Sequence, residues 1–150
     1  MNIAFFLTPK SDVVFEKSTN TMRQAIERME YHTFTAIPIL DDKGRYVGTL
    51  TEGDLLLKLK DDSNLDIKNT SKIKISEIPV HSNIKPVHID ANIEDLVATS
   101  INQNFVPVVD DYNVFIGIIK RSDIISYFYE KMYKVFRNSI FFKDKKVYAL

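Results

Sequence analysis

Two segments of the chain place charged side chains where a helix is predicted to begin, 69 residues apart. The first reads Thr51-Glu52-Gly53-Asp54 and the second Lys120-Arg121-Ser122-Asp123. The N–H groups at a helix start favour an anion, so the two cations of the second segment could hold a phosphate. The structural alternatives stay open. The first segment resembles a helix capping box, and the second could be an ordinary solvated helix start.

Residue combinations typical of catalysis or metal binding are not visible. None of the three histidines, at positions 32, 81 and 88, is followed three or four residues later by another histidine or a carboxylate. The chain has no cysteine, which excludes disulfides, zinc–thiolate sites and cysteine nucleophiles. It also lacks a nucleophile elbow and a phosphate-binding glycine loop. We therefore expect neither a metal site nor an enzyme.

An internal repeat relates the two segments to each other. The sequence from Ile37 to Asp42 is matched from Val106 to Asp111 at an offset of 69 residues, and the same offset relates Gly48 to Gly117. Upstream the offset is 71, so the second copy is two residues shorter in the loop before its proline. The repeat predicts two copies of one α/β unit that fold against each other.

Each copy predicts a helix, two strands and a second helix, with one short extra strand. Thr21 and Asn92 are candidate N-caps, and the residues after them are apolar at helical spacing. The turn between the strands has Gly44 in one copy and Asn113 in the other, the residue types that most readily adopt a positive φ. The second strands are expected over 46–50 and 114–119, and the closing helices from near Glu52 and near Ser122.

Composition and charge are those of an average globular protein, with 45% hydrophobic and 27% charged residues. Twenty basic residues offset twenty acidic ones, so net charge does not support a general role on nucleic acid or membranes. The first apolar run, from Ile3 to Leu7, is shorter than the roughly 7–15 residues of a signal-peptide core and the about 20 of a membrane span. We expect a cytoplasmic protein with no nucleic-acid or membrane partner.

The repeat also sets the expected boundaries. Residues 8–60 form the first unit and residues 75–131 the second, with the polar segment 61–74 as the linker. Residues 132–150 would be the end of a long C-terminal helix and a tail, Ile140 to Leu150. The aromatic residues of that helix are expected to pack against the protein or against a second copy: Tyr127, Phe128, Tyr129, Tyr133 and Phe136.

The repeated pattern resembles the CBS domain family. Its signature, an apolar strand opened by proline and then Gly-x-x-Thr-x-x-Asp, is complete in the first copy at Gly48, Thr51 and Asp54. The second copy has lysine at position 120 in place of the family's serine or threonine. The resemblance covers roughly residues 8–131. It implies an α/β (α+β) fold, a tandem CBS pair of two pseudo-symmetric β-α-β-β-α units packed sheet to sheet, with clefts where the units meet.

The resemblance further implies adenosine-containing ligands, such as AMP, ADP, ATP, S-adenosylmethionine or cyclic di-AMP, in those clefts. By matching positions, Asp54 would bind the ribose hydroxyls and Asp123 would be its equivalent in the second cleft. Thr51 would line the phosphate or ribose side, and Thr35 and Ala36 would meet adenine through backbone groups. Because the first copy keeps the whole motif, Asp54 is the favoured ribose ligand.

The chain is similar in particular to stand-alone CBS proteins of Gram-positive bacteria that bind cyclic di-AMP. The similarity lies in residues 34–38, 102–106 and 115–121. Lys120 and Arg121, with Lys10 in the entry segment, would suit a polyphosphate or a cyclic dinucleotide. We expect a homodimeric regulatory module that senses an adenine nucleotide and signals to a partner protein by a population shift. The alternative is a structural dimerisation or interaction module without a ligand.

Overall fold

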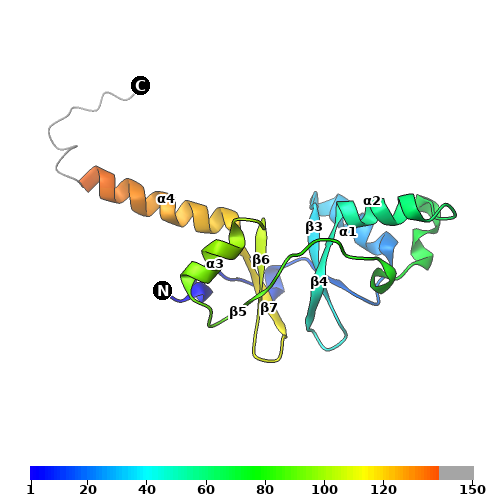
Figure 1. The fold of residues 1–150 in the computed structure, drawn as a ribbon, viewed down its shortest axis with the longest axis horizontal. Helices are drawn as coiled ribbons and strands as arrows, with labels where there is room; N and C mark the ends of the chain where they lie inside the picture. The colour runs from blue at the N-terminus through cyan, green and yellow to red at the C-terminus, as the bar shows by residue number, and fades with distance from the viewer. Residues whose placement is uncertain (139–150) are drawn as a thin grey trace, which may run out of the picture.

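The computed structural model describes residues 1–138 as two α/β halves whose small sheets face each other, with the helices on the outside (Figure 1). Each half has the predicted order of elements. The first comprises β2 (Glu16–Lys17), α1 (Met22–His32), β3 (Ala36–Leu40), β4 (Tyr46–Thr51) and α2 (Glu52–Asp61). The second comprises β5 (Val87–His88), α3 (Ile93–Ser100), β6 (Phe105–Val109), β7 (Phe115–Lys120) and α4 (Arg121–Asn138). The β-α-β-β-α prediction is confirmed for both copies.

The helices begin at the polar residues that the sequence indicated. The Thr21 hydroxyl accepts a hydrogen bond from the Gln24 N–H at the start of α1, and the Gln24 side chain completes the capping box. Asn92 caps α3 by accepting from the Asp95 N–H at 2.8 Å. Each cap satisfies N–H groups that have no partner within the helix.

The two sheets differ by one strand. In the first half the order is β2-β3-β4, and in the second it is β1-β7-β6-β5, where β1 (Thr8–Pro9) comes from the N-terminal segment of the chain. In both sheets the hairpin is antiparallel and the short strand before the helix pairs in parallel. The extra strand β1 lies antiparallel to β7, with Pro9 opposite Gly117.

The two hairpin turns are equivalent and hydrogen-bond to each other. Gly44 has a φ of 77° and Asn113 a φ of 61°, as the repeat predicted. The Tyr46 N–H donates to the Asn113 carbonyl at 3.0 Å, and the Phe115 N–H donates to the Gly44 carbonyl at 2.9 Å. These two bonds join the halves along their pseudo-twofold axis.

Three hydrophobic clusters stabilise the fold. One lies between the sheet and helices of the first half and a second lies in the corresponding place in the second half. The third joins the facing sheets and contains Leu40, Tyr46, Val109 and Phe115, all buried. The predicted sheet-to-sheet packing is therefore confirmed.

Short segments at the start of each copy pack into the opposite half. Ile3 and Phe6, on the 3₁₀ helix Ile3–Phe6, belong to the core of the second half. Ile75 and Ile78, at the second 3₁₀ helix Ile75–Glu77 and its end, belong to the core of the first. The predicted boundaries 8–60 and 75–131 follow the sequence repeat, but the packing crosses them.

The segment predicted as a linker is ordered. Within it, Ile67–Lys72 forms a 3₁₀ helix in which Thr70 is completely buried. A further 3₁₀ helix, Lys10–Asp12, lies in the N-terminal segment.

Helix α4 projects away from the two halves (Figure 1). The tail predicted from Ile140 to Leu150 lies outside the described residues. Among residues 1–138, no helix is both long and apolar enough to span a membrane.

Candidate functional site

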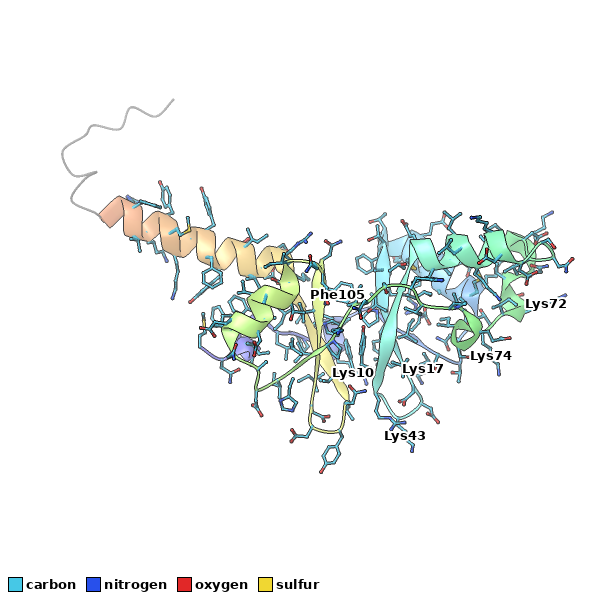
Figure 2. All side chains as sticks on the ribbon, viewed as in Figure 1. Lys10, Lys17, Lys43, Lys72, Lys74 and Phe105 are labelled. Atoms are coloured by element: carbon cyan, nitrogen blue, oxygen red, sulfur yellow. The ribbon has the colours of Figure 1, made fainter. Side chains whose placement is uncertain are left out.

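Two cavities of about 330 Å³ each lie between the halves, close to where α2 and α4 begin. The first cleft is at the start of α2, and its lining includes Thr35, Thr51, Gly53, Ile84 and Gln103. The second cleft is at the start of α4, and its lining includes Thr8, Val14, Phe34, Ile118, Lys120 and Ser122. Ala36, Asn104 and Phe105 line both. Phe105 lies at the gap between the halves (Figure 2).

In the first cleft the Asp54 carboxylate is already bonded on both oxygens. One oxygen accepts from the Thr51 N–H at 2.9 Å and from the Thr51 hydroxyl at 2.8 Å. The other accepts from the His81 N–H at 2.8 Å and lies 3.2 Å from His81 Nδ1. Burial would raise the pKa of Asp54, but the hydrogen bonds from His81 and Thr51 outweigh it, so this pKa lies below its usual range.

Asp54 is also only 2% exposed and is absent from the lining of either cleft. The capping box predicted for Thr51 and Asp54 is present. The geometry thus gives Asp54 a structural role at the start of α2, and its role as a ribose ligand stays a prediction.

At the start of α4 the equivalent carboxylate is available, although Asp123, like Asp54, is absent from the lining of either cleft. Lys120 stands where Thr51 stands in the first copy, so the side-chain hydroxyl that caps α2 has no counterpart in α4. Asp123 is exposed, and its side chain forms no hydrogen bond or ion pair with any residue in the described part of the chain. Lys120 is also exposed and lines the second cleft. Lys120 and Asp12 therefore line a largely apolar cavity, and the Asp123 carboxylate lies three residues beyond Lys120 at the start of α4.

The other two predicted cations have different contacts. The Lys10 ammonium lies 5.4 Å from the centre of the Phe15 ring, between the sheets and nearer the hairpin turns than Phe105 is (Figure 2). Arg121 bonds the loop before β6: its guanidinium donates to the Asn104 side chain, and its N–H to the Asn104 carbonyl at 3.0 Å. Neither residue lines a cleft, so the structure does not bring them together with Lys120.

Three residues near the clefts were not predicted. His81 bonds Asp54, Gln103 lies buried in the wall of the first cleft, and Phe34 lies in the wall of the second. The repeat offset of 69 pairs Gln103 with Phe34, which was a visible signal that the two clefts differ. No group of three or more histidine, aspartate or glutamate side chains within residues 1–138 could hold a metal ion.

Comparison with known proteins identifies the family. The model of the CBS domain matches twice, over residues 6–61 and 75–130. The chain therefore belongs to the CBS domain family and is a tandem CBS pair.

Known structures share this fold over most of their length. One is CbpB in complex with cyclic di-AMP, with a TM-score of 0.83 and 22% identity, covering 93% of this chain and 91% of that one. Another is CBSX2 in complex with AMP, with a TM-score of 0.69 and 23% identity, covering 87% and 98%. At this identity the similarity establishes the fold.

Among curated relatives, an uncharacterized protein of Methanopyrus kandleri is 25% identical over 118 residues, which are 77% of this chain and 58% of the relative. The chain spans only 18–21% of three larger relatives, one of them the inosine-5'-monophosphate dehydrogenase of Methanocaldococcus jannaschii. The shared part is thus the CBS pair, and the activities of those larger proteins do not transfer with it.

Proposed function

We propose that this CBS pair is a regulatory module that binds an adenine nucleotide in its second cleft and signals occupancy to a partner protein. The observation that carries the proposal is a largely apolar cavity lined by Lys120, with the unpaired carboxylate of Asp123 three residues further along at the start of α4. A cavity of about 330 Å³ is at the lower end of the about 300–1,000 Å³ typical of small-molecule sites. The AMP and cyclic di-AMP complexes of CBSX2 and CbpB support this ligand class.

Each part of a nucleotide has a counterpart in the second cleft. The base would lie against the apolar wall that includes Phe34 and Phe105, because aromatic rings stack well on bases. The ribose hydroxyls would donate to Asp123. Lys120 and the N–H groups at the start of α4 would bind a phosphate. The proposal thus moves the ribose ligand from Asp54 to its repeat equivalent.

The same helix connects the cleft to the surface. Helix α4 begins at the second cleft and then projects away from the body of the protein (Figure 1). A ligand held by Lys120 and Asp123 would contact the first turn of α4 directly. It would therefore favour one orientation of the helix, and a partner that contacts α4 would detect the population shift.

Calorimetric titration with AMP, ATP and cyclic di-AMP tests the site. We expect binding by the wild-type chain, and a loss of about ten- to hundredfold in affinity for Asp123→Asn, because a hydrogen bond to a charged group contributes about 1.5–3 kcal/mol. Asp54→Asn is the matched control and should bind normally below its melting temperature. No binding of any of the three at millimolar concentration, or full affinity in Asp123→Asn, would contradict the proposal.

A second candidate function, a dimerisation module without a ligand, is favoured by the surface of α4. Ile125, Tyr129 and Met132 are exposed apolar residues spaced by four and then three positions, and exposed Phe128 and Tyr133 flank them. This alternating spacing is that of a helix seam that pairs with a second helix. We infer that the chain forms a homodimer through α4, whether or not it binds a nucleotide.

Sedimentation velocity of a Tyr129→Glu/Met132→Glu variant tests the dimer. Two charges in the seam should convert the dimer to a monomer, whereas Lys134→Glu, on the opposite side of the helix, should leave it dimeric. A monomeric wild-type chain would refute the dimer. If the dimer forms but no nucleotide binds, the second candidate function replaces the first.

A further inference from the structure

We propose that the first cleft, although similar in volume to the second, does not take a nucleotide because the chain's own residues already occupy its recognition groups, with Gln103 taking the hydrogen bonds that an adenine base would need there. Only the second cleft then accepts a nucleotide, and each chain binds one. This inference rests on the proposed function, since it concerns which cleft the adenine nucleotide enters.

The segment that occupies these groups is 79–86, which we call the strap. It runs past the first cleft and is bonded to the first half at three points. The His81 N–H donates to Asp54 at 2.8 Å, the Ser82 hydroxyl to the Thr49 carbonyl at 3.0 Å, and the Tyr46 hydroxyl to the Ile84 carbonyl at 3.1 Å. A ligand that entered this cleft and bound Asp54 would have to displace His81.

Gln103 fixes the other end of the strap. Its side-chain oxygen accepts from the Lys85 N–H at 2.9 Å, and its side-chain nitrogen donates to the Lys85 carbonyl at 3.2 Å. One edge of adenine offers the same pair, an acceptor at N7 and a donor at N6. Gln103 lines the first cleft, and its amide is already paired with the Lys85 backbone beside that cleft, so these backbone groups are not available to a base.

The second cleft lacks each of these contacts at the equivalent positions. Phe34 replaces Gln103 and is 41% exposed, and it has no amide to bond a backbone. Val14 replaces Lys85, lines the cleft, and its N–H and C=O have no hydrogen-bond partner among residues 1–138. Lys10 replaces His81 but lies over Phe15 instead of bonding a carboxylate. All three differences leave the second cleft open to a base.

Substitution of Phe34, the repeat equivalent of Gln103, tests the inference. Phe34→Gln should weaken nucleotide binding about tenfold or more, because the new amide can pair with Val14 and a base must displace both bonds. Phe34→Leu is the matched control, which removes the ring without adding an amide. Equal affinity of the two variants would overturn the role assigned to the amide.

Stoichiometry separates this inference from the proposed function. The wild-type chain should bind one AMP per chain in calorimetry, and Gln103→Ala should add a second, weaker site. Two sites of similar affinity in the wild type would overturn the inference about the first cleft while leaving nucleotide binding in the second cleft intact.

Hydrogen exchange tests the pairing of the strap without any ligand. The amides of His81 and Lys85 should be protected in the wild-type chain, the amide of Val14 should exchange rapidly, and Gln103→Ala should expose Lys85. Rapid exchange of Lys85 in the wild type would overturn the inference even if no nucleotide bound.

Discussion

Gly117 tests whether the N-terminal segment is an essential part of the second half. A Cβ added at this position would lie 2.2 Å from the Thr8 carbonyl oxygen and 2.9 Å from Leu7 Cδ1. Because one of these neighbours is backbone, β1 would have to move away from β7. Overpacking of this kind costs about 1–3 kcal/mol. If the movement also withdraws Phe6 from the core, the cost rises by about 1.5–3 kcal/mol.

Gly48 provides a matched control for Gly117→Ala. The two glycines are equivalent in the repeat and have nearly the same φ, 157° and 159°, so any backbone cost of alanine cancels between them. A Cβ at Gly48 would have no atom within 4 Å.

Thermal unfolding monitored by circular dichroism then compares the two variants. For a chain of this size each kcal/mol shifts Tm by about 2–4 °C, so Gly117→Ala should melt about 2–12 °C below Gly48→Ala. Limited proteolysis should also cleave the N-terminal segment of Gly117→Ala first. Equal melting temperatures would refute the reasoning, because the contact between β1 and β7 would then contribute nothing to stability.

Three further predictions concern titration and the turns. Because the pKa of Asp54 lies below its ordinary 3.8, its contribution to stability is present above about pH 4 and is lost as pH falls through the lowered pKa. Asp54→Asn should therefore lower Tm at pH 7, with a deficit that shrinks toward pH 3; a deficit independent of pH would count against this. Burial raises the pKa of Tyr46 to about 12. The neutral side chain therefore contributes to the free energy of unfolding below about pH 10, and this contribution is lost as pH rises toward 12. The absorbance difference between wild type and Tyr46→Phe should show no tyrosinate at pH 10 while the protein is folded. Asn113→Ala should lower the free energy of unfolding in urea by about 1–2 kcal/mol more than Asn113→Gly, since only alanine strains a φ of 61°.

The repeat made much of the fold predictable. A strand that contains proline and a turn at Gly44 or Asn113 occur twice, so each copy supports the interpretation of the other, although the proline lies at the third residue of β3 and β6 and not at the start that we predicted. The caps at Thr21 and Asn92 were predictable as well, since capping depends on residues within one turn of the helix. Local patterns thus gave the elements and their order.

The exchange of short segments between the halves was not predictable. The segments that contain Ile3 and Ile75 each have only a few apolar residues. A run that short does not indicate which of the two similar cores it enters. That choice depends on the path of the chain in space. The predicted boundaries therefore follow the sequence repeat and miss the packing.

The candidate site was predicted in part. Thr35, Ala36, Thr51 and Lys120 do line the clefts, because their positions depend on the ends of predicted strands and helices. The preference for the first cleft depended on its complete motif. Whether a carboxylate is available depends on long-range partners such as His81, 27 residues from Asp54, and sequence spacing does not show these.

The exchanged segments also determine when the protein can fold during synthesis. β1 pairs Thr8 with Ile118, and the first half needs Ile75 and Ile78 to complete its core. A ribosome adds about 5–20 residues per second, so Thr8 waits about 5–20 s before its partner strand is made. During that interval Ile3 and Phe6 have no core to enter. The core of the first half, by contrast, is available once Ile78 is made, so we expect the first half to fold before the second.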